Sequence, residues 1–313
     1  MASRDAALGM IFLSQTVFGI LGNFSLLHHY LFLYSTGRGL RSTDLILKHL
    51  VVAKSLVLFS KGVPQTMAAF GLKDFLNDTG CKLVFYLHRV ARGVSISSTC
   101  LFSIFQAITI SLRNSRWAEL KLKSSKHIGS FICLCWILHT LASIIFPMYV
   151  TSKWNNTNTT VKKDFGYCSG ILPNKITQSL HAALLSISGV FCLGLMLWAS
   201  GSTIYIRYRH KQRVQHIHRT NASSRSSLES RATQSILVLV STFVSFYTFS
   251  TIFQVYIALY NNPSSLLVNI SAFINECFPI VSPFVLMTHG FSVYSLCFVW
   301  IRNTKSPNLI RNI

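Results

Sequence analysis

The sequence predicts an all-α membrane protein, a single bundle of seven transmembrane helices, and three observations support this fold class. Half of the 313 residues are hydrophobic and only 12% are charged, whereas soluble domains carry about 25% charged residues. The mean hydropathy is +0.44. Apolar windows long enough to cross a bilayer, which takes about 20 helical residues, recur along the chain. These windows lie at Leu8–Leu33, Leu45–Phe70, Leu83–Leu112, Ile128–Val150, Ile176–Ile206, Ile236–Leu259 and Leu266–Met287.

The seven windows differ in how clearly they indicate a span. The first and the fourth are clear, whereas the second, third and seventh contain charged residues and are inferred partly from their length. The first begins by about Leu8 and is long enough to remain as a span, so no cleavable signal peptide is expected. Together the windows leave no room for a separate soluble domain, and residues 1–313 are expected to form one transmembrane domain.

The basic residues predict the orientation of the chain. The net charge is +21, which raises the question of a nucleic-acid partner. However, Lys and Arg concentrate in the loops after spans one, three and five and in the tail after span seven. This positive-inside bias predicts an extracellular N-terminus, a cytosolic C-terminus and no nucleic-acid partner. Membrane lipids are expected partners, and each basic loop residue can be a topology signal beside anionic lipid or a contact for another partner.

Two cysteines and three glycosylation sequons fall in the predicted outer loops. Cys81 opens span three, and Cys168 lies in the loop between spans four and five. Both positions face an oxidising compartment, where a disulfide between them can form. Glycosylation is predicted at three N-x-S/T sequons of these loops. They are Asn77, Asn155 and Asn158.

Span three contains cations at an unusual depth. The stretch "YLHRVARGVSISS" carries His88, Arg89 and Arg92, about 10–17 Å from Cys81 at 1.5 Å per helical residue. A charged residue at this depth costs roughly 2.5–3.5 kcal/mol on insertion scales. Spacings of three and four residues place these side chains on one helix face, and that face is expected to line a cavity between the helices.

Glu276 is the one acidic residue well inside a predicted span, in "FINECFPIVSP". Its depth is compatible with a salt bridge to Arg89 or Arg92, but one carboxylate cannot neutralise two guanidinium groups. A spare guanidinium favours an anionic ligand, so His88, Arg89, Arg92 and Glu276 are the predicted ligand-binding residues. Alternatively, the arginines bind Glu276, backbone carbonyls and water and thereby tighten the bundle.

Other polar and aromatic residues within the spans are weaker candidates. Lys54 of span two is expected to join a polar network with Asn23 or, alternatively, to be an unpaired amine that is neutral when buried. Span six is rich in aromatic residues, any of which could line a pocket or pack against lipid and other helices. The candidates considered are Tyr247, Phe249, Phe253 and Tyr256.

Several long strings resemble the vomeronasal type-1 pheromone receptors, a family of G-protein-coupled receptors. They include "RSTDLILKHLVVAKSLVLFSKGVPQTMAAFG", "CKLVFYLHRVARGVSISSTCLFSIFQAITISLRNSRWAELK", "FPMYVTSKWN", "LGLMLWASGSTIYIRYRHKQRVQHIH", "RATQSILVLVSTFVSFYTFS" and "CFPIVSPFVLM". The resemblance implies a multi-pass receptor of the plasma membrane that binds a small chemosignal and activates an inhibitory-type heterotrimeric G protein. It also implies the Cys81–Cys168 disulfide and ligand contacts near the depth of Arg89 and Arg92.

The chain departs from the large rhodopsin-like class of these receptors at its inner side. The place of the Asp/Glu-Arg-Tyr motif after span three reads Phe105-Gln106-Ala107. The Asn-Pro-x-x-Tyr signature of span seven is replaced by "SPFVL", which begins at Ser282. Activation is therefore expected to use other inner contacts.

The run "IRYRHKQRVQHIHRT" continues span five into the predicted cytosol without an acidic complement. As a helical extension it offers a cationic surface to a G protein or to anionic lipid. The predicted G-protein contacts are Arg207, Arg209, Lys211 and Arg213.

The motifs of enzymes are missing from the sequence. It has no H-E-x-x-H, no G-x-S-x-G and no phosphate-binding Gly-rich loop, so no enzyme activity, cofactor or metal site is predicted. A transporter is the alternative, because transporters also place charges at the membrane midplane. Seven spans do not divide into repeated halves, however, and no paired broken helices are evident.

Overall fold

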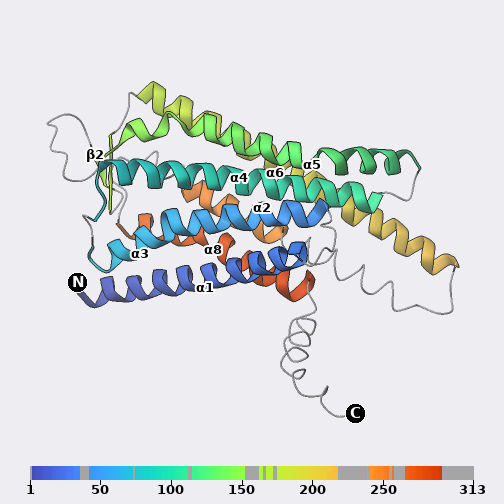
Figure 1. Cartoon of the computed structure of the whole chain (residues 1–313), viewed down its shortest axis with the longest axis horizontal. Helices are drawn as coiled ribbons and strands as arrows, with labels where there is room; N and C mark the ends of the chain where they lie inside the picture. Colours follow the sequence, from blue (N-terminus) through green and yellow to red (C-terminus); the bar gives the residue numbers. More distant parts are fainter. Residues whose placement is uncertain are drawn as a thin grey trace, which may run out of the picture.

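The computed structural model is mostly helical (Figure 1). The residues that it describes are 2–35, 42–72, 75–111, 115–151, 162–164, 167–171, 175–217, 238, 240–253, 256 and 265–290. The long helices are α1 (Ala2–Ser35), α2 (Ser42–Val57), α4 (Asp78–Ser111), α5 (Ser115–Ser143), α6 (Lys175–Ile217) and α8 (Ser265–Gly290). A helical segment at Val240–Phe253 lies inside the predicted sixth span.

Four helical segments in the described part of the chain are long and apolar enough to cross a membrane. They are Ala6–Phe32, His127–Tyr149, Gly189–Ile206 and Leu266–Met287, which match the predicted spans one, four, five and seven. The second predicted span corresponds to α2 and the helical turns that follow it up to α3 (Val63–Ala69), and the third corresponds to α4. These elements carry the buried or partly buried cations Lys54, Lys61 and Arg92. The remainder of the sixth predicted span lies largely outside the described residues.

Helix α1 packs closely against α8 through two glycines and one side-chain hydrogen bond to a backbone carbonyl. A side-chain carbon at Gly22 would lie 3.2 Å from Pro283 Cβ, and one at Gly19 would lie 2.9 Å from Ile280 Cγ1, so the two backbones approach closely. Pro283 has no N–H to donate to Pro279 O one turn earlier. Asn23 Nδ2 donates to that oxygen instead, at 2.9 Å.

The second predicted span is one continuous helical path with a widened turn. It runs from α2 through the π-helical turn η1 (Leu58–Gly62) into α3 (Val63–Ala69). Val63 N–H donates to Leu58 O, five residues earlier. Pro64 cannot donate to Ser60 O and its ring would crowd that carbonyl in a regular α-helix, and a π-helical turn accommodates the proline.

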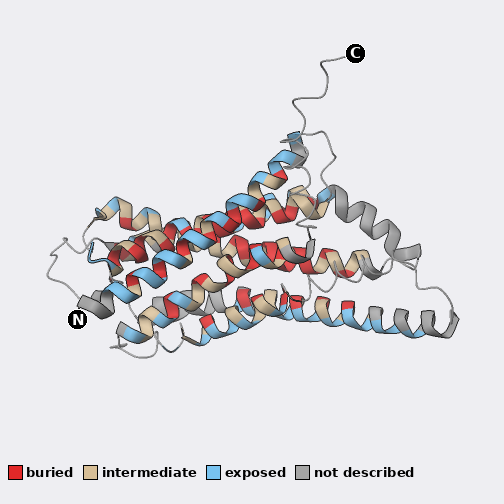
Figure 2. Ribbon diagram, turned by 90° about the horizontal axis from the view of Figure 1, so that it is seen from below, coloured by how far each residue is buried: buried red, intermediate tan, exposed pale blue. Residues whose placement is uncertain are grey.

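The core lies around α4, which packs against α2, α5 and α6. Figure 2 shows the buried residues along the inner sides of the long helices. The main apolar cluster draws one or more side chains from each of six helical elements. Its members include Leu50 of α2, Phe102 of α4, Ile132 of α5, Met196 of α6, Phe243 of the Val240–Phe253 segment and Phe278 of α8. Outward-facing apolar side chains such as Trp198 and Phe191 of α6 are exposed, as expected for a lipid-facing surface.

A small sheet adds to the expected all-α architecture. Strands β1 (Val150–Thr151), β2 (Lys162–Asp164) and β3 (Ser169–Ile171) pair antiparallel in the order β1-β3-β2. The predicted fourth span reaches Val150, but α5 ends at Ser143 and a short 3₁₀ turn, η2 (Phe146–Tyr149), follows before β1. The sheet lies at the same end of the bundle as the N-terminus and α3 (Figure 1).

Candidate functional site

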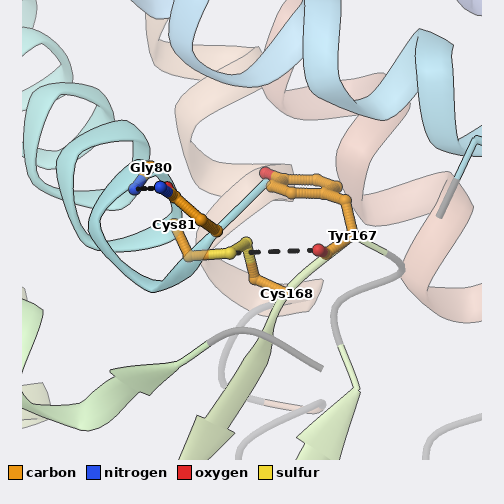
Figure 3. Close-up of a disulfide and its surroundings, with 5 residues drawn as sticks. Gly80, Cys81, Tyr167 and Cys168 are labelled. Atoms are coloured by element: carbon orange, nitrogen blue, oxygen red, sulfur yellow. Dashed lines mark hydrogen bonds between the residues drawn. A yellow bond between two sulfur atoms is a disulfide. The ribbon is translucent and has the colours of Figure 1, made fainter. Parts of the chain in front are cut away.

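A disulfide fixes the sheet to the start of α4. Cys81 and Cys168 are joined, with their Cα atoms 5.9 Å apart and a sequence separation of 87. Both cysteines are fully buried. Because Cys168 directly precedes β3, the disulfide holds the loop between α5 and α6 against the end of the bundle (Figure 3).

Tyr167 lies beside this disulfide and faces the bundle. Its ring packs on Phe85 of α4, with the ring centroids 5.8 Å apart, and its carbonyl oxygen lies 3.9 Å from Cys81 Sγ (Figure 3). Burial raises the pKa of Tyr167 above its ordinary value, and the nearby carboxylate of Glu276 acts in the same direction. The disulfide therefore places an aromatic side chain within electrostatic reach of α8.

A pocket lies between α4, the Val240–Phe253 segment and α8. Its polar side chains are His88, Arg92, Ser95, Ser250 and Asn275, and aromatic and aliphatic side chains form the rest of its wall. The latter are Val57, Ile96, Phe243, Phe246, Tyr247, Ile274, Phe278 and Pro279. A mostly apolar pocket with a few convergent polar groups is typical of small-molecule sites.

Arg92 crosses this pocket and is fixed on its far side. Its Nη2 donates to Ser250 Oγ at 3.1 Å, and Ser250 Oγ donates in turn to Asn275 Oδ1. Asn275 Nδ2 donates to Ser271 O at 2.7 Å. The guanidinium carbon also lies 5.8 Å from the centroid of the Tyr247 ring. The position of Arg92 on α4 is therefore fixed by the Val240–Phe253 segment and, through Ser250, by α8.

Gly189 of α6 makes room for Tyr247. The Tyr247 hydroxyl occupies the space that a side-chain carbon at Gly189 would need. Tyr247 also stacks on Phe243, with the ring centroids 5.7 Å apart. The position of this ring, and of the cation–π contact with Arg92, therefore depends on a glycine at 189.

The cations of span three separate into two groups. His88 and Arg92 line the pocket, whereas Arg89 is not among the residues that line it in the described structure. Positions 88 and 92 are four residues apart and share a face, while position 89 is turned by about 100° from position 88. Nδ1 of His88 is buried and has no hydrogen-bond partner among the described residues.

Glu276 does not form the expected salt bridge with Arg89 or Arg92. Its side chain is fully buried, and neither carboxylate oxygen has a hydrogen-bond partner in the described part of the chain. It lies against η1 instead, where Oε2 is 3.4 Å from the position of a side-chain carbon at Gly62. Arg92 donates a hydrogen bond to Ser250. Lys61 is the cation that interacts electrostatically with Glu276.

Lys61 was missed by the sequence reasoning, although a signal was present. It follows Lys54 by seven residues, which is two helical turns and places both on one face of span two. The depth of Lys61 relative to Glu276 also depends on the π-helical turn before Pro64. That turn was not predicted.

Lys54 does not form the expected network with Asn23, and the aromatic candidates divide between the pocket and the surface. Lys54 is buried, and its Nζ lies 4.4 Å from the centroid of the Phe278 ring. It makes no hydrogen bond to Asn23 or to any other described residue. Asn23 instead donates from Nδ2 to Gly19 O and Pro279 O. Of the four aromatic candidates Tyr247 lines the pocket, whereas Phe249 and Tyr256 are exposed.

The predicted modification and partner sites are placed only in part. Asn77 is exposed, and its Oδ1 accepts a hydrogen bond from Gly80 N–H at 2.8 Å, so it caps the N-terminus of α4. Asn155 and Asn158 lie outside the described residues. Arg207, Arg209, Lys211 and Arg213 all fall on the last turns of α6, and Arg209 is exposed over the ring of Tyr205.

Comparison with known proteins decides the family. The model of the vomeronasal organ pheromone receptor family matches residues 6–299. The chain is 65% identical to human vomeronasal type-1 receptor 4 over 302 residues, which cover 96% of this chain and all of the relative. It is 57% identical to human vomeronasal type-1 receptor 3 over 313 residues, covering 99% of this chain and all of that receptor. The chain belongs to the vomeronasal type-1 receptor family.

More distant similarity extends beyond mammals. Olfactory receptor class A-like protein 1 of zebrafish is 28% identical over 281 residues, covering 90% of this chain and 88% of that protein. The vomeronasal type-1 receptors are a receptor family and not an enzyme family, which agrees with the lack of enzyme motifs.

Proposed function

We propose that this chain is a G-protein-coupled chemosensory receptor of the plasma membrane that binds a small anionic molecule in the pocket around His88 and Arg92. The observation that supports this proposal is that the basic side chains of His88 and Arg92 line one pocket together with aromatic side chains. A guanidinium group has five N–H donors in a planar fork and carries a permanent charge. A ligand with an apolar body and one carboxylate or sulfate group fits both parts.

The proposed orientation of the chain in the membrane follows from the distribution of its Lys and Arg residues. With seven spans, an extracellular N-terminus and a cytosolic C-terminus, the disulfide end of the bundle faces the outside and the end of α6 faces the cytosol. The positive-inside bias supports this orientation. It also puts the disulfide in an oxidising compartment and the sequons at Asn77, Asn155 and Asn158 where glycans are attached.

The cytosolic end of α6 is the proposed contact for an inhibitory-type heterotrimeric G protein. Arg207, Arg209, Lys211 and Arg213 extend the helix beyond the apolar segment Gly189–Ile206. A dense positive surface of this kind steers an acidic partner surface by long-range attraction.

The experiment that tests the proposal is a ligand screen in cells that express the full chain. Small carboxylates, sulfates and their neutral isosteres are applied, and nucleotide exchange on an inhibitory-type G protein is measured. The proposal expects activation by anions and no accumulation of a labelled agonist in the cells. Accumulation of the labelled compound without nucleotide exchange would instead favour a transporter.

A further inference from the structure

Glu276 is a carboxylate that needs a positive neighbour. It is 0% exposed, and in the described structure neither of its oxygens accepts a hydrogen bond. A buried charge without compensation is very unfavourable. A positive group close to Glu276 stabilises its charged form through the low-dielectric interior, without a direct hydrogen bond.

The widened turn η1, which carries Lys61, lies against this carboxylate. A side-chain carbon at the next residue, Gly62, would lie 3.4 Å from Glu276 Oε2 and 2.9 Å from Thr16 Oγ1, so the backbone of η1 approaches Glu276 closely. Lys61 and Glu276 interact electrostatically with each other. No hydrogen-bonded salt bridge joins them among the described residues, so their interaction is electrostatic and involves no direct hydrogen bond.

The other cations near the pocket have different neighbours. Arg92 donates to Ser250 Oγ and lies over the ring of Tyr247. Lys54 lies over the ring of Phe278. Both residues therefore point toward the Val240–Phe253 segment or the inner part of α8, while Lys61 is on the turn that contacts Glu276.

We propose that Lys61, and neither arginine of α4, is the counter-charge of Glu276. The pair fixes the α2–α3 helix to α8 at the end of the bundle nearest the disulfide. It also has a consequence that rests on the proposed function. Because Lys61 balances the one carboxylate, the positive charge of Arg92 remains uncompensated by Glu276 and acts on an anionic ligand.

Rescue by double substitution tests the pairing. The full chain is expressed with Lys61→Met, with Glu276→Gln and with both, and the surface fraction is measured by surface biotinylation relative to total protein. Each single substitution leaves one buried charge alone, so each is expected to lower the surface fraction several-fold. The double variant is expected to regain about half or more of the parent level, since neither charge is left alone.

Three matched double variants provide the controls. Glu276→Gln is combined with Lys54→Met, Arg89→Met or Arg92→Met, each of which also removes a buried or partly buried cation. None of these is expected to restore the surface fraction. For variants that do not reach the surface, the same comparison is made on detergent-solubilised protein by its thermal aggregation temperature.

The pairing is overturned by any of three results. The first is rescue of Glu276→Gln by Arg89→Met or Arg92→Met as strong as the rescue by Lys61→Met. The second is a double variant of Lys61 and Glu276 whose loss equals the product of the single losses. The third is no loss in either single variant. No ligand enters these measurements, so they can fail while the proposed function stands, and the reverse.

Discussion

Arg92 of α4 donates a hydrogen bond to Ser250 Oγ at 3.1 Å, and this bond joins two helices across the pocket. Ser250 Oγ in turn donates a hydrogen bond to Asn275 Oδ1 of α8. Three helical elements thus meet at one guanidinium group. A ligand anion that binds Arg92 would compete with Ser250 for its donors, and that competition links occupancy of the pocket to the relative positions of α4, the Val240–Phe253 segment and α8.

Removing the disulfide should have one effect and not two. We expect Cys81→Ala and Cys168→Ala to lower surface expression equally, because each breaks the same bond, and disulfides typically contribute about 2–4 kcal/mol to stability. The double variant should be no worse than either single variant. Surface labelling relative to total protein measures all three, and additive losses in the double variant would contradict a shared bond.

The sequon at Asn77 should be separable from its role as a helix cap. Thr79→Ala removes the glycan signal and keeps the cap, and Asn77→Asp does the same because an Asp side chain also accepts from the helix N-terminus. Asn77→Gln should lose both. We expect all three to lose the same glycosidase-sensitive mass, while Asn77→Gln alone loses about 1 kcal/mol of stability, measured by thermal aggregation in detergent.

That prediction has a clear failure. An unchanged electrophoretic mobility in Thr79→Ala and Asn77→Asp would show that Asn77 carries no glycan, and it would remove one support for the extracellular placement of the start of α4.

Gly189→Ala should disturb the pocket from outside it. The added carbon meets the hydroxyl of Tyr247, so the ring must move away from Arg92. We expect a lower agonist potency at equal surface expression. Gly194→Ala on the same helix is the control, since nothing lies within 4 Å of its added carbon, and alanine favours a helix over glycine by about 1 kcal/mol. Equal behaviour of the two variants would contradict the Tyr247 packing.

Neutralising the end of α6 should separate signalling from ligand binding. We expect replacement of Arg207, Arg209, Lys211 and Arg213 by Gln to weaken nucleotide exchange on the G protein and to leave binding of a labelled agonist nearly unchanged. Both are measured on membranes adjusted to equal receptor content. If delivery to the surface collapses instead, these residues act mainly as a topology signal.

The sequence predicted the helices well because apolar length and charge asymmetry are local properties. Four predicted spans match helical segments that are long and apolar enough to cross a membrane. The fourth predicted span, Ile128–Val150, matches the segment His127–Tyr149, in which α5 ends at Ser143 and the 3₁₀ turn η2 follows. The small sheet was not predicted, since strands of two or three residues leave almost no periodic signal.

The candidate site was predicted only in part because its partners depend on geometry between helices. Helical spacing placed His88 and Arg92 on one face, and both line the pocket. The same spacing argument also admitted Arg89, which does not. Depth alone paired Glu276 with the arginines, whereas Glu276 lies against the π-helical turn that carries Lys61. A widened turn shifts the helical phase in a way that residue counting cannot follow.

Agonist charge dependence in Arg92→Ala is the most direct test of an anion-binding pocket. A carboxylate agonist is compared with its neutral carboxamide on the parent receptor, Arg92→Ala and Arg89→Ala, with responses normalised to surface expression. Charge-assisted hydrogen bonds contribute about 1.5–3 kcal/mol, so Arg92→Ala should lose about ten- to a hundredfold in potency for the carboxylate. It should change little for the carboxamide, and Arg89→Ala should change little for both. Equal losses for the two ligands in Arg92→Ala would contradict the account and would mean that Arg92 holds the helices together without reading the charge of the ligand.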